Sequence, residues 1–98
     1  MEKDLERRVK KKAKELGWMT CKVGIDGYPD RLFIKKGVHI WLEFKTTTGK
    51  ISPRQRKRIK ELLKQGCHVA VIDDVQKALL FLEESYNFQK AMEIIDAP

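Results

Sequence analysis

A strand-like run at residues 38–45 is followed by a helix start and by a second apolar run at residues 67–72. The first run is rich in the β-branched and aromatic residues typical of strands. Ser52-Pro53-Arg54-Gln55 supplies a capping serine, a proline at the first helical position and a glutamine three residues after the cap, which indicates a helix over residues 53–65. A helix that joins two strands is a crossover, so these strands are predicted to be parallel. This step restricts the chain to an α/β fold.

The remaining elements complete an order of α-β-β-β-α-β-α. Leu5, Val9, Ala13 and Leu16 form one apolar stripe at helical spacing, ended by a glycine. The pattern predicts helices at 2–16 and 74–84, strands at 18–23 and 31–35, and loops at 24–29, 36–37 and 46–50. We therefore expect an α/β sandwich with a mixed central sheet, built as a single domain over residues 1–98.

Several packing expectations follow from the same patterns. In the third strand, Val38, Ile40 and Leu42 should share one face, and Glu43 and Lys45 the other. Three apolar positions of the helix over 53–65 should face the core: Ile59, Leu62 and Leu63. The short apolar strand at 67–72 is expected to be buried on both faces.

The last residues, 85–98, are less periodic and are predicted to form a C-terminal tail outside a core of about residues 2–84. Their apolar side chains could pack on the domain or on a partner: Phe88, Met92, Ile94 and Ile95.

Charge indicates the class of partner. The chain has 98 residues, with 21 Lys and Arg against 14 Asp and Glu, so its net charge is +7. Such an excess on a small domain favours a polyanion, of which nucleic acid is the first candidate, although a basic protein need not bind one. Cys21 and Cys67 are isolated and are expected to be reduced core thiols. No apolar run approaches the roughly 18 residues of a membrane span, so an intracellular location is expected.

Two carboxylates and a lysine form the candidate catalytic set. Asp30 follows a turn sequence, and Glu43 lies thirteen residues later in the tripeptide Glu43-Phe44-Lys45. Two neighbouring extended segments would bring Asp30 and Glu43 together, and the main-chain carbonyl of Phe44 could add a third oxygen for a divalent cation. Lys45 projects from the same strand face as Glu43 and could orient a water or stabilise transition-state charge.

This pattern resembles the PD-(D/E)xK nuclease superfamily, and more closely its virus-type replication-repair nuclease domain, VRR-NUC. The resemblance lies in Gly27-Tyr28-Pro29-Asp30, in Glu43-Phe44-Lys45 and in the Ser-x-x-Gln helix start after a polar loop. It covers about residues 2–84. It implies a restriction-endonuclease-like fold and an Mg²⁺- or Mn²⁺-dependent DNA endonuclease.

The resemblance also implies a substrate and an assembly. Small members of the family look like phage proteins associated with cleavage of four-way junctions by homodimers, as in DNA repair and recombination. We therefore expect branched DNA as substrate, a homodimer, and the cytoplasm of a bacterial or phage-infected cell. The competing hypothesis is a non-catalytic basic DNA-binding module that retains the nuclease fold.

Further site residues are expected from the family. An acid on the first helix should complete the metal site. Glu6 lies at the edge of the apolar arc and is preferred, with Glu2 one turn away as the alternative. Both could instead be acids that favour a helix N-terminus. Gln55 is expected beside the active site, but it could also serve the helix cap, and both roles are compatible.

Two basic sets are the candidate DNA contacts. The first is Lys50, Arg54 and Arg58, at and near the start of the helix over 53–65. The second is Arg31, Lys35 and Lys36. A solvated helix face is the simpler explanation of such charges. If they do bind DNA, the contacts should be largely sequence-neutral and strongly salt-dependent.

Overall fold

The computed structural model describes residues 2–46 and 48–98; Thr47, within the predicted polar loop, lies outside the described residues. The elements follow the predicted order. They are α1 (Glu2–Glu15), β1 (Met19–Lys22), β2 (Arg31–Lys35), β3 (Val38–Phe44), α2 (Pro53–Lys64), β4 (His68–Ile72) and α3 (Val75–Ile95).

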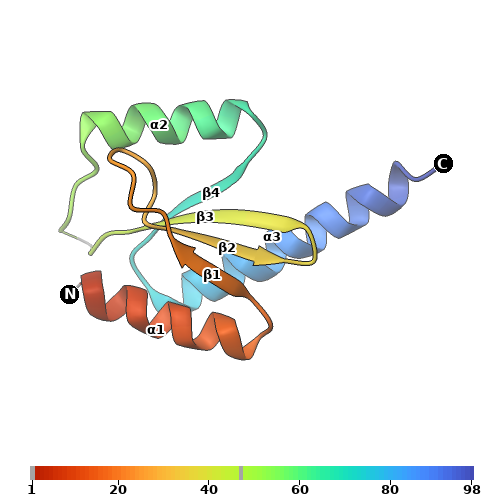
Figure 1. The fold of residues 1–98 in the computed structure, drawn as a ribbon, viewed down its shortest axis with the longest axis horizontal. Coiled ribbons are helices and arrows are strands. Elements are labelled where there is room, and N and C mark those ends of the chain that lie inside the picture. Colours follow the sequence, from red (N-terminus) through yellow and green to blue (C-terminus); the bar gives the residue numbers. More distant parts are fainter. Residues whose placement is uncertain (1, 47) are drawn as a thin grey trace.

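The strands form one mixed sheet in the order β1-β2-β3-β4 (Figure 1). β1 pairs with β2 and β2 with β3 in antiparallel fashion, whereas β3 and β4 are parallel, as the crossover predicted. The predicted α/β fold class is confirmed. No helix within the described residues combines the length and the apolar character that crossing a membrane requires.

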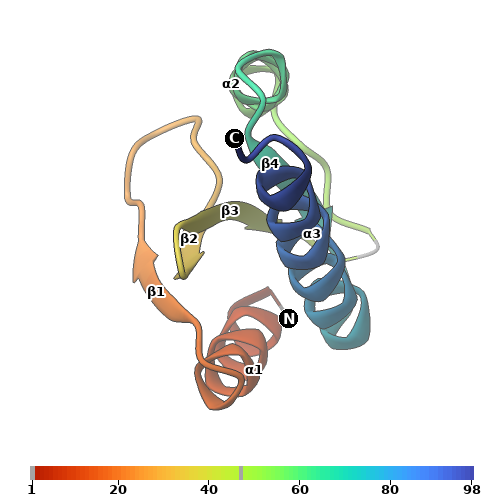
Figure 2. The ribbon, with the colours of Figure 1, turned by 90° about the vertical axis from the view of Figure 1, so that its right-hand side faces the viewer.

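The hydrophobic core lies between one face of the sheet and the helices α1 and α3 (Figure 2). Leu5, Val9 and Ala13 of α1 meet the side chains of Val38, Ile40, Leu42 and Phe44 of β3 and of Val75, Ala78 and Leu82 of α3. The predicted alternation of β3 is confirmed. It leaves Glu43 on the face turned away from α1 and α3.

Helix α2 lies on the other side of the sheet from α1 (Figures 1 and 2). None of its residues is fully buried. The expectation that Leu63 faces the core is wrong, because its side chain is 52% exposed; Ile59 and Leu62 are only half-buried. α2 rests mainly on β4 at the edge of the sheet, where little apolar surface is available to cover its stripe.

Both edge strands are more exposed than their sequences predicted. Within the described part of the chain, no strand pairs with the outer edge of β4, and Val71 is 41% exposed, so the expectation of burial on both faces is wrong. Cys21 lies on the opposite edge strand and is exposed, so it is not a core thiol; Cys67 is half-buried, and both cysteines are free.

The last helix is longer than predicted. α3 continues to Ile95 rather than ending near residue 84, since no glycine or proline interrupts residues 75–95. Its first half packs on the core, and its second half runs past the sheet (Figure 1). Four apolar side chains there are exposed and do not pack on the core: Phe88, Met92, Ile94 and Ile95.

Candidate active site

Glu43 is the buried acid of the sheet face that looks towards α2. Its side chain is 1% exposed, although it is a carboxylate near the end of a strand. The alternation of β3, which places Leu42 and Phe44 in the core, directs Glu43 to the opposite face. A buried carboxylate is costly unless partners stabilise its charge, so its surroundings identify what it does.

The loop before β2 brings Asp30 to Glu43. Pro29 is buried, and Gly27 has a φ of +84°, which a side chain would strain. A Cβ at Gly27 would lie 2.9 Å from Cγ of Arg54, so the loop packs closely on the first turn of α2. The Asp30 carboxylate then accepts a hydrogen bond of 2.8 Å from the backbone N–H of Phe44. This bond joins the Gly-x-Pro-Asp turn to the Glu-Phe-Lys segment.

Two side chains contact one oxygen of Glu43. The Gln55 side-chain amide donates to Oε2 at 3.0 Å, and Nζ of Lys45 lies 3.5 Å from the same atom. Gln55 also completes the capping box, because its Oε1 accepts from the N–H of Ser52, and its own N–H donates to the Ser52 hydroxyl. The cap of α2 and the contact with Glu43 thus use the same residue, as the sequence allowed.

The two carboxylates, Asp30 and Glu43, lie close enough for the charge of one to change the pKa of the other. Burial, and secondly the charge of Asp30, raise the pKa of Glu43 from its ordinary value of 4.5 to about 7, while Lys45 and Gln55 oppose the rise. Two neighbouring carboxylates that are partly desolvated ionise together only when positive charge is added. The pair therefore favours a cation.

The donor set fits a hard divalent ion. Oε1 of Glu43 is buried and has no hydrogen-bond partner among the described residues. Carboxylate oxygens are the ligands that Mg²⁺ and Mn²⁺ prefer. Within residues 2–46 and 48–98, however, no three Asp, Glu, His or Cys side chains gather closely enough to hold a metal ion by themselves. The acid expected from the first helix does not join the pair.

Glu6 instead forms an ion pair with Arg31, with Oε2 at 2.7 Å from Nε. Arg31 shares its strand face with Phe33 of the core, so this ion pair lies on the α1 side of the sheet and Glu43 on the α2 side. Glu2 is placed differently. A Cβ at Gly49 would lie 2.8 Å from Oε1 of Glu2, so that carboxylate sits beside the loop that follows Lys45.

The first predicted DNA-contact set is partly engaged within the protein. Arg54 forms an ion pair with Asp26, a partner that the sequence analysis missed. Arg58 lies over the Tyr28 ring at 4.6 Å and pairs with Glu61 at 3.0 Å. Lys50 is exposed. Tyr28 also contacts Trp41, with ring centroids 5.9 Å apart, which joins the Asp30 loop to both β3 and α2.

The second predicted set is not one surface. Arg31 begins β2 and is held by Glu6, whereas Lys35 and Lys36 lie at the far end of the strand. Lys36 is exposed in the β2–β3 turn, with a φ of 45°. The role of each residue of both sets in DNA contact stays a prediction.

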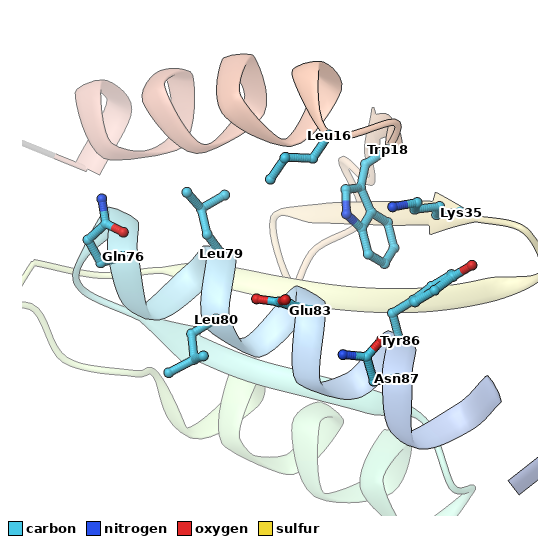
Figure 3. Close-up of a pocket in the computed structure, with 9 residues that line it drawn as sticks. All are labelled: Leu16, Trp18, Lys35, Gln76, Leu79, Leu80, Glu83, Tyr86 and Asn87. Carbon is cyan, nitrogen blue, oxygen red and sulfur yellow. The ribbon is translucent and has the colours of Figure 1, made fainter. Parts of the chain in front are cut away.

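Lys35 belongs to a hollow of about 420 Å³ between α1, β2 and α3 (Figure 3). Its Nζ lies 4.9 Å from the centroid of the Tyr86 ring and 5.7 Å from that of Trp18. The other lining residues are Leu16, Gln76, Leu79, Leu80, Glu83 and Asn87. Lys35 therefore interacts with aromatic faces there, away from Asp30 and Glu43.

Comparison with known proteins supports a family. The arrangement of acids and lysine at the ends of adjoining strands of a mixed sheet belongs to the class of nuclease-fold α/β domains. A solved structure described as "VRR_NUC domain" superposes with a TM-score of 0.74 and 25% sequence identity, over 84% of this chain and 94% of that chain. This similarity supports a VRR-NUC domain, the family that the motifs predicted. No family profile and no curated protein matches the sequence.

Proposed function

We propose that the chain is a divalent-metal-dependent DNA endonuclease that hydrolyses phosphodiester bonds as a single domain. The observation that carries the proposal is the buried Glu43, whose Oε1 has no partner among the described residues while Lys45 and Asp30 lie beside it. Buried carboxylate oxygens normally have a hydrogen-bond partner, and one without a partner is available as a metal ligand.

Asp30, Glu43 and the carbonyl of Phe44 would hold Mg²⁺ or Mn²⁺. Such an ion supplies Lewis-acid polarisation of the phosphate and a more acidic bound water. The hydrogen bond from the N–H of Phe44 fixes one oxygen of Asp30 and so orients the other. Gln55 holds Oε2 of Glu43, which keeps Oε1 directed to the ion.

Lys45 carries the positive charge next to the metal ligands. Its ammonium lies 3.5 Å from Oε2 of Glu43 and its side chain is one-fifth exposed, so it can reach substrate from the strand end. There it would orient the attacking water and stabilise the charge that develops on the phosphoryl oxygens.

The third acid would come from the start of α1. Glu6 was expected, but its carboxylate is paired with Arg31 on the far side of the sheet. Glu2 lies beside the loop after Lys45 and is the better-placed candidate. Cleavage by Glu2→Gln and Glu6→Gln in limiting Mg²⁺ distinguishes them, because only the ligand's variant should need more metal for half-maximal rate.

The nuclease assignment is tested by Asp30→Asn and Lys45→Ala, assayed with Mg²⁺ and Mn²⁺. Both should cut DNA at least about 100-fold more slowly and still bind it, because charge stabilisation of the transition state is lost while the basic surfaces remain. Asp96→Asn, just after α3, and Lys64→Ala, at the end of α2, make the same chemical changes away from the site and should cut normally. Full cleavage by either site variant would remove the assignment, and metal-independent binding without cutting would favour the DNA-binding module.

Branched DNA, and four-way junctions first, is the proposed substrate class, on the strength of the family resemblance. Symmetric cleavage of a junction needs two sites, and one chain offers one. The exposed apolar side chains at the end of α3, including Phe88 and Ile95, would support a homodimer. A cleavage panel of junction, flap, duplex and single strand tests the substrate. Light scattering that shows a monomer both with and without DNA would contradict the dimer.

A further inference from the structure

A shallow basic hollow lies on the flank of α1, where β1 ends and β2 begins. Its volume is about 200 Å³. It is lined by Lys3, Arg7, Lys10, Lys22, Arg31 and Glu6. Five of these side chains are basic, and the one acid, Glu6, is already bound to Arg31. The hollow therefore concentrates positive charge that its own lining does not neutralise.

The lysines of the hollow carry the unneutralised charge. Arg7 pairs with Asp4, but Lys3, Lys10 and Lys22 take part in no ion pair among the described residues. Lys22 stands directly opposite Arg31 in the β1–β2 pairing. Like charges at directly opposed strand positions destabilise a sheet. Glu6 already neutralises Arg31, so the charge of Lys22 is the one that an added anion would neutralise here.

The strand ends that carry residues of the hollow and of the candidate active site lie at the same end of the sheet (Figure 1). Lys22 ends β1, Arg31 begins β2 and Phe44 ends β3. Arg31 also follows Asp30 directly, so the Cα atoms of the two residues are about 3.8 Å apart. The hollow and Glu43 lie on opposite faces of the sheet but at the same strand ends, so a nucleic acid strand that crosses these ends would come near both.

The basic helix α2 offers less unpaired charge close to the site. Arg54 is paired with Asp26, and Arg58 is shared between Glu61 and the Tyr28 ring. Both arginines must exchange a partner within the protein for phosphate. The lysines of the hollow need no such exchange, which favours them as the stronger contacts.

We infer that the basic hollow binds the phosphate backbone of the DNA next to the phosphodiester that is cut; this inference rests on the proposed function. Arg31 supplies the fixed group, because Glu6 holds its guanidinium through Nε and leaves the terminal nitrogens for phosphate. Lys3, Lys10 and Lys22 supply mobile charges around it. The contact depends on the charge and spacing of the phosphates and not on the base sequence of the DNA.

The test compares two double charge reversals in the inactive Asp30→Asn protein. Lys10→Glu with Lys22→Glu changes the hollow, and Lys60→Glu with Lys64→Glu changes exposed positions of α2. The Asp30→Asn protein has a net charge of +8, one more than the natural +7, and each pair lowers it by four to +4. Affinity for a four-way junction is measured by fluorescence anisotropy over a range of salt concentrations.

The hollow variant should bind about 100-fold more weakly and lose roughly two from its log–log salt slope, one for each phosphate contact removed. The α2 variant should lose severalfold less affinity. Equal weakening by the two pairs would mean that only net charge matters and would overturn the inference, even if the natural protein cuts DNA. Failure of the Asp30→Asn protein itself to bind any DNA would overturn the proposed function as well.

A stability measurement separates a binding role from a structural one. Lys22 is exposed and forms no ion pair among the described residues, so Lys22→Glu should leave the melting temperature close to that of the natural protein while its DNA affinity falls. A variant that lost both stability and binding would point to a structural lysine and contradict the inference. The neutral pair Lys10→Gln with Lys22→Gln repeats the comparison without adding new charges, against Lys60→Gln with Lys64→Gln.

Discussion

Helices α1 and α2 have the same kind of sequence, a basic helix with one apolar stripe, yet they are held in different ways. α1 buries Leu5, Val9 and Ala13 in the core, whereas α2 buries no residue. α2 is fastened by polar contacts instead: its cap at Ser52, the bond from Gln55 to Glu43, and the Asp26 and Tyr28 loop. One helix thus stabilises the fold, and the other is tied to the candidate site.

The largest expected effect tests that difference in packing. Leu5→Ala should lower the free energy of unfolding by about 2–4 kcal/mol, because it removes a side chain from the core. The same change on α2, Leu63→Ala, should cost less than about 0.5 kcal/mol, since that side chain is half exposed. Urea unfolding of both variants measures the contrast. Similar losses would mean that α2 also packs as a core helix.

The next effect concerns the site to which α2 is tied. The pKa of Glu43 is raised to about 7 in the folded chain, so the folded chain holds this proton more tightly than the unfolded chain does. The contribution of this proton to the free energy of unfolding is fully present below pH 4.5 and is lost as the pH rises through 7. In metal-free protein it should fall by roughly 3 kcal/mol by about pH 8.

Glu43→Gln is the matching variant, because it keeps the shape and removes the charge. The difference in unfolding free energy between it and the natural protein should therefore grow in favour of Gln as the pH rises. The loss caused by Leu5→Ala, on the other helix, should be the same at every pH. If this difference did not depend on pH, the pKa of Glu43 would not be raised in the folded chain.

The smallest effect concerns the charges of α2. Asp26→Asn should change stability by less than about 1 kcal/mol, since the ion pair with Arg54 is largely exposed. It frees Arg54, so DNA affinity in the Asp30→Asn protein should rise a few-fold. Asp96→Asn makes the same charge change at the end of α3 and serves as control. An equal rise in both variants would assign the effect to net charge alone.

Much of the fold was predictable because its signals are local. The capping box at Ser52 and Gln55, the alternation of Val38 to Glu43 and the crossover between β3 and β4 all depend on residues close in sequence. The proximity of Asp30 to the Glu-Phe-Lys segment could also be predicted, since adjacent antiparallel strands bring the start of one to the end of the next.

Other features depend on neighbours that are distant in the chain. The apolar stripe of α2 could not reveal that only an edge strand lies beneath it. Nothing near Glu6 in sequence predicts that its carboxylate forms an ion pair with Arg31. The length of α3 is a different case, because the absence of glycine and proline from residues 85–95 was a local signal for it.

The sequence by itself determined the element order, the strand faces and the acids and lysine that make a VRR-NUC domain recognisable. Only the tertiary structure decided which charges are paired, which helix is buried and which acid of α1 lies near the loop after Lys45. The physical reason is the distance along the chain over which each property is set. Periodicity and caps are properties of a few consecutive residues, whereas burial and ion pairing depend on the surface that the rest of the fold presents.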